Sequence, residues 1–173
     1  MQPPFDCSNF AQKLRDIVAQ SLPGTDVGED LTERISALTF VHPAHEATVL
    51  LVVEAEHDLN PLPTVLIAVV IGDWQDLQQK DNVAQMFALN PQLMTCAVGL
   101  MPINDDELAV VLSRRMPAQQ IEPAEIVSLI DDIIWDYARC SGWLQTNALP
   151  ETPAPSTIEM PPRPKLIGSL DEA

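Results

Sequence analysis

Basic residues are scarce in this 173-residue sequence, in which 9 Lys and Arg stand against 25 Asp and Glu and leave a net charge of −16. Proteins that bind DNA or RNA neutralise phosphates with Lys and Arg, and a surface this acidic repels nucleic acid unless one patch breaks the trend. The two short basic groups, Arg114-Arg115 and Arg163-Pro164-Lys165, are too small for such a patch. The composition therefore excludes nucleic acid as a partner and counts against anionic membrane surfaces.

Long apolar runs are also lacking. No run of about 18 apolar residues occurs, and Met1 to Asp6 shows no basic stretch followed by an apolar one, as a secretory signal would. The three cysteines, Cys7, Cys96 and Cys140, are odd in number and far apart, which favours free thiols in a reducing compartment. We therefore expect a soluble cytoplasmic protein without membrane insertion, with Cys7 exposed and the other two cysteines in the core.

Catalytic and metal-binding patterns are missing as well. With 6 glycines in the chain there is no phosphate-binding loop, and the nucleophile-elbow and zinc-protease motifs are absent. His42, His45 and His57 lie beside prolines and acids and are interpreted as turn residues rather than ligands. Asp131 and Asp132 point about 100° apart on a helix and do not converge. These observations predict a protein that is no enzyme and uses no cofactor or metal, and an enzyme with a divergent site stays an alternative.

What the sequence does contain is the periodicity of an α+β domain in residues 1–149. Apolar residues recur at helical spacing in three segments and form strand-like runs in five others. The expected order is helix, three strands, helix, two strands, helix, with a mostly antiparallel twisted sheet. The predicted elements are residues 9–22, 35–41, 47–54, 64–71, 76–90, 94–101, 107–113 and 122–144. Residues 23–33 are interpreted as an acidic connector.

Two predicted strands, 47–54 and 64–71, are apolar at nearly every position. Such strands are buried on both faces of their sheet. Helices on one face leave the other uncovered, so the second face needs a second subunit, a bound polypeptide, or both. We expect a homodimer, with Val83, Met86 and Phe87 of the second helix at its interface.

After Leu149 the composition changes to Pro, Thr, Ser and Glu. Such a segment buries too little apolar surface to offset the entropy of ordering it, which predicts a disordered tail in residues 150–173. Leu166 to Leu170 is apolar and is a candidate for a short docking element.

Between Phe10 and Leu144 the sequence resembles the class I type III secretion chaperones, a family related to the CesT/Tir chaperones. The resemblance rests on element order and on five segments, which are Phe87-Ala88-Leu89-Asn90, Val98-Gly99-Leu100, Glu107 to Leu112, Arg115-Met116-Pro117 and Ile126 to Trp143. Two features depart from the family pattern: the last hairpin turn carries Asn104-Asp105-Asp106 without the usual glycine, and a long Pro-rich tail follows the last helix.

The resemblance implies an acidic homodimer that binds the non-globular N-terminal segment of a secreted effector protein and keeps it competent for secretion. It places the partner on the first helix and the adjacent strand. Phe10, Leu14 and Ile17 share a helix stripe, and Leu38 and Phe40 share one side of a strand. For each of these five residues the alternative is an ordinary place in the hydrophobic core. The alternative function is a YbjN-type or chaperone-like regulatory protein that sequesters a protein partner.

Overall fold

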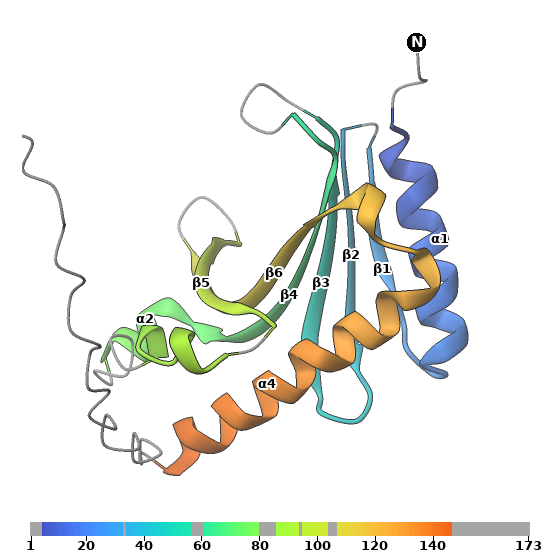
Figure 1. Ribbon diagram of the computed structural model, residues 1–173. Coiled ribbons are helices and arrows are strands. Elements are labelled where there is room, and N and C mark those ends of the chain that lie inside the picture. The colour runs from blue at the N-terminus through green and yellow to red at the C-terminus, as the bar shows by residue number, and fades with distance from the viewer. Residues whose placement is uncertain are drawn as a thin grey trace, which may run out of the picture.

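The computed structural model describes residues 5–32, 34–56, 61–79, 86–93, 95–103 and 107–146. The described part begins with a helix, continues through six strands and closes with a long helix (Figure 1). The strands are β1 (Gly28–Leu31), β2 (Ile35–His42), β3 (Ala47–Glu54), β4 (Thr64–Asp73), β5 (Ala97–Pro102) and β6 (Leu108–Pro117). The α-helices are α1 (Cys7–Ser21), α2 (Trp74–Gln79) and α4 (Ile126–Thr146), and the short 3-10 helices are η1 (Asn90–Gln92), η2 (Ala118–Gln120) and η3 (Pro123–Glu125).

The strands form one sheet in the order β1-β2-β3-β4-β6-β5, and every neighbouring pair is antiparallel. This confirms the predicted α+β class with a helix at each end of the sheet-forming segment. The β3 bounds agree with the prediction, because an apolar run there ends at turn residues on both sides. The sheet has one strand more than predicted.

The additional strand is β1, which lies within the segment interpreted as an acidic connector. That interpretation is wrong for Gly28 to Leu31, which pairs with β2 from Gly28 opposite Thr39 to Leu31 opposite Ser36. Gly, Glu and Asp have low intrinsic strand propensity, so tertiary pairing rather than local preference makes this strand. An ion pair 2.8 Å long between Arg15 of α1 and Glu29 links it to the helix.

The helix α1 starts two residues earlier than predicted, because Asp6 caps it. The Asp6 carboxylate accepts a hydrogen bond from the Asn9 backbone N–H at 2.9 Å, which satisfies a helix N-terminal donor. The buried residues Cys7, Ala11, Leu14 and Val18 recur at helical spacing along one side of α1. This side faces the sheet.

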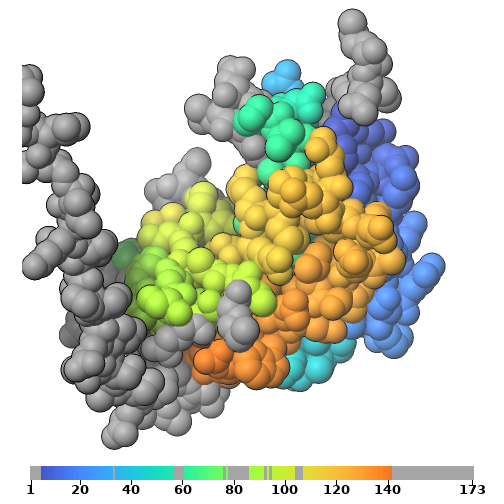
Figure 2. Space-filling model, in the orientation of Figure 1, coloured from blue at the N-terminus to red at the C-terminus, as the bar shows by residue number. Residues whose placement is uncertain are grey.

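Both long helices lie on the same face of the sheet. The α1 helix packs on β2 and β3 and α4 packs on β4 and β6, with the two helices also in contact. The buried apolar residues of α1, α2 and α4 all belong to the main hydrophobic cluster on this side, where they meet Leu38, Leu51, Ile67 and Leu112 of the strands. Figure 2 shows this covered side, with α4 and the segment leading into it lying over the strands.

Several predictions fall outside the described residues. These are the tail 150–173, His57, the hairpin turn 104–106 and Val83. Among the helices of the described part, none is both long and apolar enough to cross a membrane.

Candidate functional site

The sheet face that points away from α1 and α4 is called the open face below. Side chains alternate along each strand, and the strand register places on this face the odd residues 35–41 of β2, the even residues 48–54 of β3, the even residues 64–70 of β4 and the odd residues 109–115 of β6. Its centre is a second hydrophobic cluster, built from strand residues alone, in which Ala68, Ala109 and Val111 are buried beside Leu50, Val70 and Met101. No helix of the described part contributes a buried residue to it.

The rim of the open face is exposed. Ile35 is 53% exposed and Val41 is 52% exposed, at opposite ends of β2. The small side chains Ala68 and Ala109 at the centre have no exposed surface, because larger neighbours surround them. The open face is thus an apolar surface whose central side chains are buried among their neighbours and whose outer side chains are exposed.

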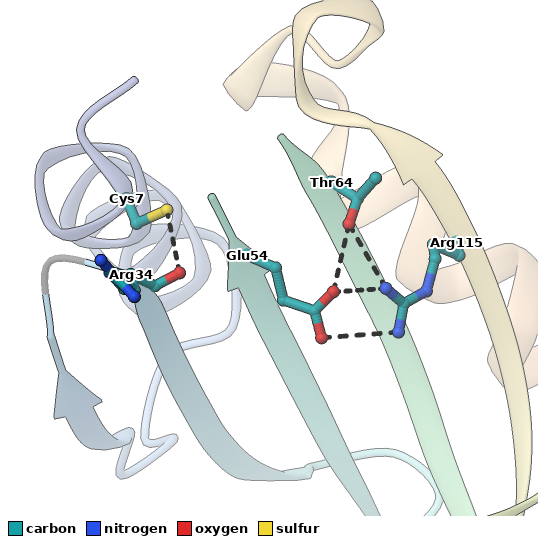
Figure 3. Close-up of polar contacts among 5 residues, drawn as sticks. All are labelled: Cys7, Arg34, Glu54, Thr64 and Arg115. Carbon is teal, nitrogen blue, oxygen red and sulfur yellow. Dashed lines mark hydrogen bonds and ion pairs between the residues drawn. The ribbon is translucent and has the colours of Figure 1, made fainter. Parts of the chain in front are cut away.

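An ion pair between Glu54 and Arg115 lies at one end of the open face, and Figure 3 shows these two residues with Thr64 on the strand between them. The Arg115 guanidinium of β6 donates to both carboxylate oxygens of Glu54 on β3, a two-pronged geometry that strengthens such pairs. Thr64 of β4 lies between them, donating to Glu54 Oε2 at 3.4 Å and accepting from Arg115 Nη1 at 3.5 Å. The two charges cancel each other.

The five residues predicted to bind a partner lie together at the contact between α1 and the sheet. Leu14 and Leu38 have no exposed surface and Phe40 is 2% exposed. Phe10 and Ile17 are half-buried and pack against the same cluster. The structure therefore brings the predicted residues together, with three of them in the core of the single chain and two at the rim of that contact.

The predicted dimer residues divide in the same way. Met86 is fully buried within the chain, whereas Phe87 is 37% exposed. Of these two, Phe87 has side-chain surface available to a partner.

The two edges of the sheet differ, which sequence reasoning missed. At the β5 edge the Asn90 side chain occupies the outward backbone groups of Val98, to which a further strand would bind. Its Oδ1 accepts from the Val98 N–H at 2.6 Å, and its Nδ2 donates to the Val98 carbonyl at 3.4 Å. The strand ends at Pro102, which has no N–H to offer a further strand. Both features hinder the addition of another strand.

The β1 edge has no such block among the described residues. The Thr32 N–H donates to the Ile35 carbonyl at 3.1 Å in the turn between β1 and β2. Because N–H groups alternate in direction along a strand, those of Glu29 and Leu31 point away from β2. Gly28, Glu29 and Asp30 are exposed. This edge can therefore accept a further strand.

Replacing Asn90 tests the β5 block. Asn90→Ala leaves the Val98 N–H and carbonyl without partners, and we expect the free energy of unfolding to fall by about 1–2 kcal/mol, as for loss of a typical pair of hydrogen bonds. Urea denaturation measures the change. Asn90→Asp keeps the acceptor for the Val98 N–H and should recover part of the loss, and equal losses in the two variants would show that this bond carries no stability.

Asp136 forms a buried polar cluster beneath α4. Its side chain, in a residue only 1% exposed, accepts from Thr95 Oγ1 at 3.1 Å, from Cys96 Sγ at 3.4 Å and from Arg139 Nη1 at 3.4 Å. Burial and then the hydrogen bond to Asp136 raise the pKa of Cys96 to about 12. Burial, followed by the Asp136 charge, also raises the pKa of Cys140. Both thiols are thus held protonated, the opposite of an activated nucleophile.

Cys7 differs from its expected position. The expectation that it is exposed is wrong, because α1 begins at this residue and turns it toward the sheet, where it has no exposed surface. Its thiol donates to the Arg34 carbonyl at 3.6 Å (Figure 3). Burial, followed by the charge of Asp6, raises the pKa of Cys7.

His42 also differs from its interpretation as a turn residue. It ends β2 and is 5% exposed, with Nε2 3.5 Å from Asp131 Oδ1 of α4. His45 lies in the following turn. Within the described ranges, no three His, Cys, Asp or Glu side chains gather closely enough to hold a metal ion.

The sequence matches no protein-family model and no curated protein. The resemblance to secretion chaperones therefore depends on the residues and segments of this chain alone.

Proposed function

We propose that this protein is a secretion chaperone of the class I type III kind, which holds the non-globular N-terminal segment of an effector protein in the bacterial cytoplasm. The observation that supports the proposal best is the difference between the two sheet edges. One edge is closed by Asn90 and Pro102, while the other, at β1, presents outward backbone groups that pair with no further strand of the described part. A protein that adds a partner's strand needs one such edge and no reactive group.

The partner segment lies along β1 in this proposal. Its backbone pairs with the outward groups of Glu29 and Leu31 and extends the six-stranded sheet by one strand. Asp30 and, before the strand, Asp26 are exposed and make this edge acidic, while the charge of Glu29 is paired with Arg15. The chemistry of the edge fits an extended segment that carries Lys or Arg between apolar residues.

The predicted residues Phe10 and Ile17 enter the proposal as an apolar rim for flanking parts of the partner, since both are half-buried. Leu14, Leu38 and Phe40 support the helix and strand on which that rim lies. A homodimer would present two β1 edges to partner segments. A YbjN-type regulator that sequesters a protein partner would use the same edge, and the identity of the captured protein separates these functions.

The test removes one outward donor from β1. Glu29→Pro deletes an N–H at the edge, whereas the matched control Glu29→Ala loses the ion pair to Arg15 but keeps the N–H. The partner is first identified by co-purification from the native host, and the affinity of a synthetic peptide of its N-terminal segment is then measured by calorimetry. We expect at least a tenfold weaker affinity for Glu29→Pro and less than a threefold change for Glu29→Ala.

Equal affinities in the two variants would remove strand addition at β1 from the proposal. A captured protein that is not secreted would favour the regulatory alternative.

A further inference from the structure

The central part of the open face carries no net charge in a protein that is otherwise strongly acidic. Its four long strands contribute four positions each to the central part of this face, sixteen in all, and Glu54 and Arg115 are the charged residues among them. Two further carboxylates lie at its edges: Asp30 of β1 is opposite Ala37, and Asp73, past the bulge of β4, is opposite Ala109. Glu54 and Arg115 form an ion pair, so the central part of the face carries no net charge. The whole chain carries a net charge of −16.

We infer that the open face is covered by the open face of a second copy of this chain, giving a dimer in which two sheets pack face to face. This inference deepens the proposed homodimer by naming its surface, and it does not depend on which partner β1 holds. Two chains of charge −16 repel each other across most of their surfaces. The apolar centre of this face, which carries no net charge, is where they can approach with the least repulsion.

The size of the face suits a second copy. Four strands spaced about 4.8 Å apart and eight residues long, with the shorter β1 and β5 added, cover about 650 Å². Stable interfaces bury about 600–1,000 Å² on each partner. An extended peptide is one strand wide and would leave most of this surface in water.

The side chains also suit sheet-on-sheet packing. Leu50, Val52, Leu66 and Val70 are half-buried and line the middle strands. Interdigitated side chains of this kind fill the roughly 10 Å between two packed sheets. Ile35 and Val41, at about half exposure in the single chain, would lie at the ends of the interface.

The test compares two variants, each of which introduces a glutamate on a different face of the sheet. Leu66 lies on the open face, and Leu100 of β5 is 42% exposed on the helix-covered face, opposite Val110. We expect light scattering at micromolar concentration to give twice the chain mass of 19.0 kDa, or 38.0 kDa, for the unmodified chain and for Leu100→Glu. Leu66→Glu should give 19.0 kDa with an unchanged far-ultraviolet dichroism spectrum.

Salt provides an independent readout. Because added salt screens the repulsion between the two acidic chains but leaves apolar contact intact, the dimer dissociation constant should fall severalfold between low and high salt. A dimer joined by ion pairs would weaken instead, and that result would overturn the inference.

Two other results would also overturn it. The unmodified chain could be a monomer at micromolar concentration. That result would also be found if a different partner or residues 150–173 covered the open face in place of a second copy. Leu66→Glu could remain a dimer. In that second case, dissociation of the dimer by Phe87→Glu would move the interface to the second helix.

A second variant applies if Leu66→Glu unfolds. Val41→Glu changes a side chain that is 52% exposed in the single chain, so its fold does not depend on that residue. We expect a dissociation constant at least tenfold higher, and an unchanged constant would overturn the inference. Glu29→Pro should leave the 38.0 kDa mass intact, so failure of the β1 proposal and failure of this one are distinguishable.

Discussion

Phe40→Ala is expected to lower the free energy of unfolding by about 3–5 kcal/mol, the usual cost of removing a buried aromatic ring. Phe40 is 2% exposed and lies in the main cluster between β2 and α1. For a domain of this size each kcal/mol shifts the melting temperature by about 2–4 °C, which predicts a decrease of roughly 6–20 °C. Thermal and urea denaturation measure both quantities.

Phe10→Ala is the matched control, because the same ring is removed from a half-buried position. Its phenyl ring packs against Phe5, with ring centroids 5.3 Å apart. We expect a loss less than half that of Phe40→Ala. A Phe40→Ala variant as stable as Phe10→Ala would mean that β2 does not pack beneath α1 as described.

Much of this fold follows from local sequence patterns. The β3 run from Ala47 to Glu54 and the α4 stripe of Ile126, Ile130 and Ile133 are long, strongly periodic segments. In such segments hydrophobic spacing and local propensity agree. Strand β1 could not be predicted in this way. Its four residues carry no alternating apolar pattern, and its place in the sheet comes from pairing with β2.

The candidate site was less accessible to sequence reasoning. The periodicity of α1 and β2 correctly grouped Phe10, Leu14, Ile17, Leu38 and Phe40. Spacing alone does not say which of two apolar sheet faces the helices cover, because β3 and β4 are apolar on both. That choice determines whether a residue is core or surface.

Contacts between residues that are far apart in the sequence could not be predicted either. Arg115 and Glu54 lie 61 positions apart, and the Asn90 block of β5 depends on a side chain meeting a backbone eight positions away. A signal for Asn90 did exist, since its Asn-Pro step marks a chain break before a strand. Its hydrogen-bond partner had no local signature.

The raised thiol pKa values have a consequence for stability at high pH. Cys96 ionises near 12 in the folded chain and near its ordinary value of 9.0 when unfolded. Between these values the unfolded chain has lost the proton that the folded chain keeps, so stability falls as pH rises from about 9 to about 12. Below pH 9 the contribution is fully present.

The same pKa predicts that Cys96 reacts very slowly. The thiolate is the reactive species, and at pH 8 its fraction is about 10⁻⁴ for a pKa of about 12 and about 0.1 for a pKa of 9.0. Labelling with a disulfide reagent should therefore be about 1,000-fold slower in the folded chain than in urea. The Cys7→Ser/Cys140→Ser variant isolates this thiol, and absorbance at pH 8 follows its reaction.

The Asp136→Asn variant separates the effect of the Asp136 carboxylate on the pKa of Cys96 from the effect of burial. Burial is the largest cause of the raised pKa and persists in this variant, while the negative charge that accepts the thiol hydrogen bond is removed. The pKa of Cys96 should fall part of the way toward 9.0, and labelling of the folded variant should become at least threefold faster. Dichroism at the same pH confirms that the variant remains folded.

Labelling of the unmodified Cys96 in the folded chain at a rate within tenfold of its rate in urea would contradict the buried cluster of Thr95, Cys96 and Asp136, because a thiol held by that carboxylate cannot ionise so readily.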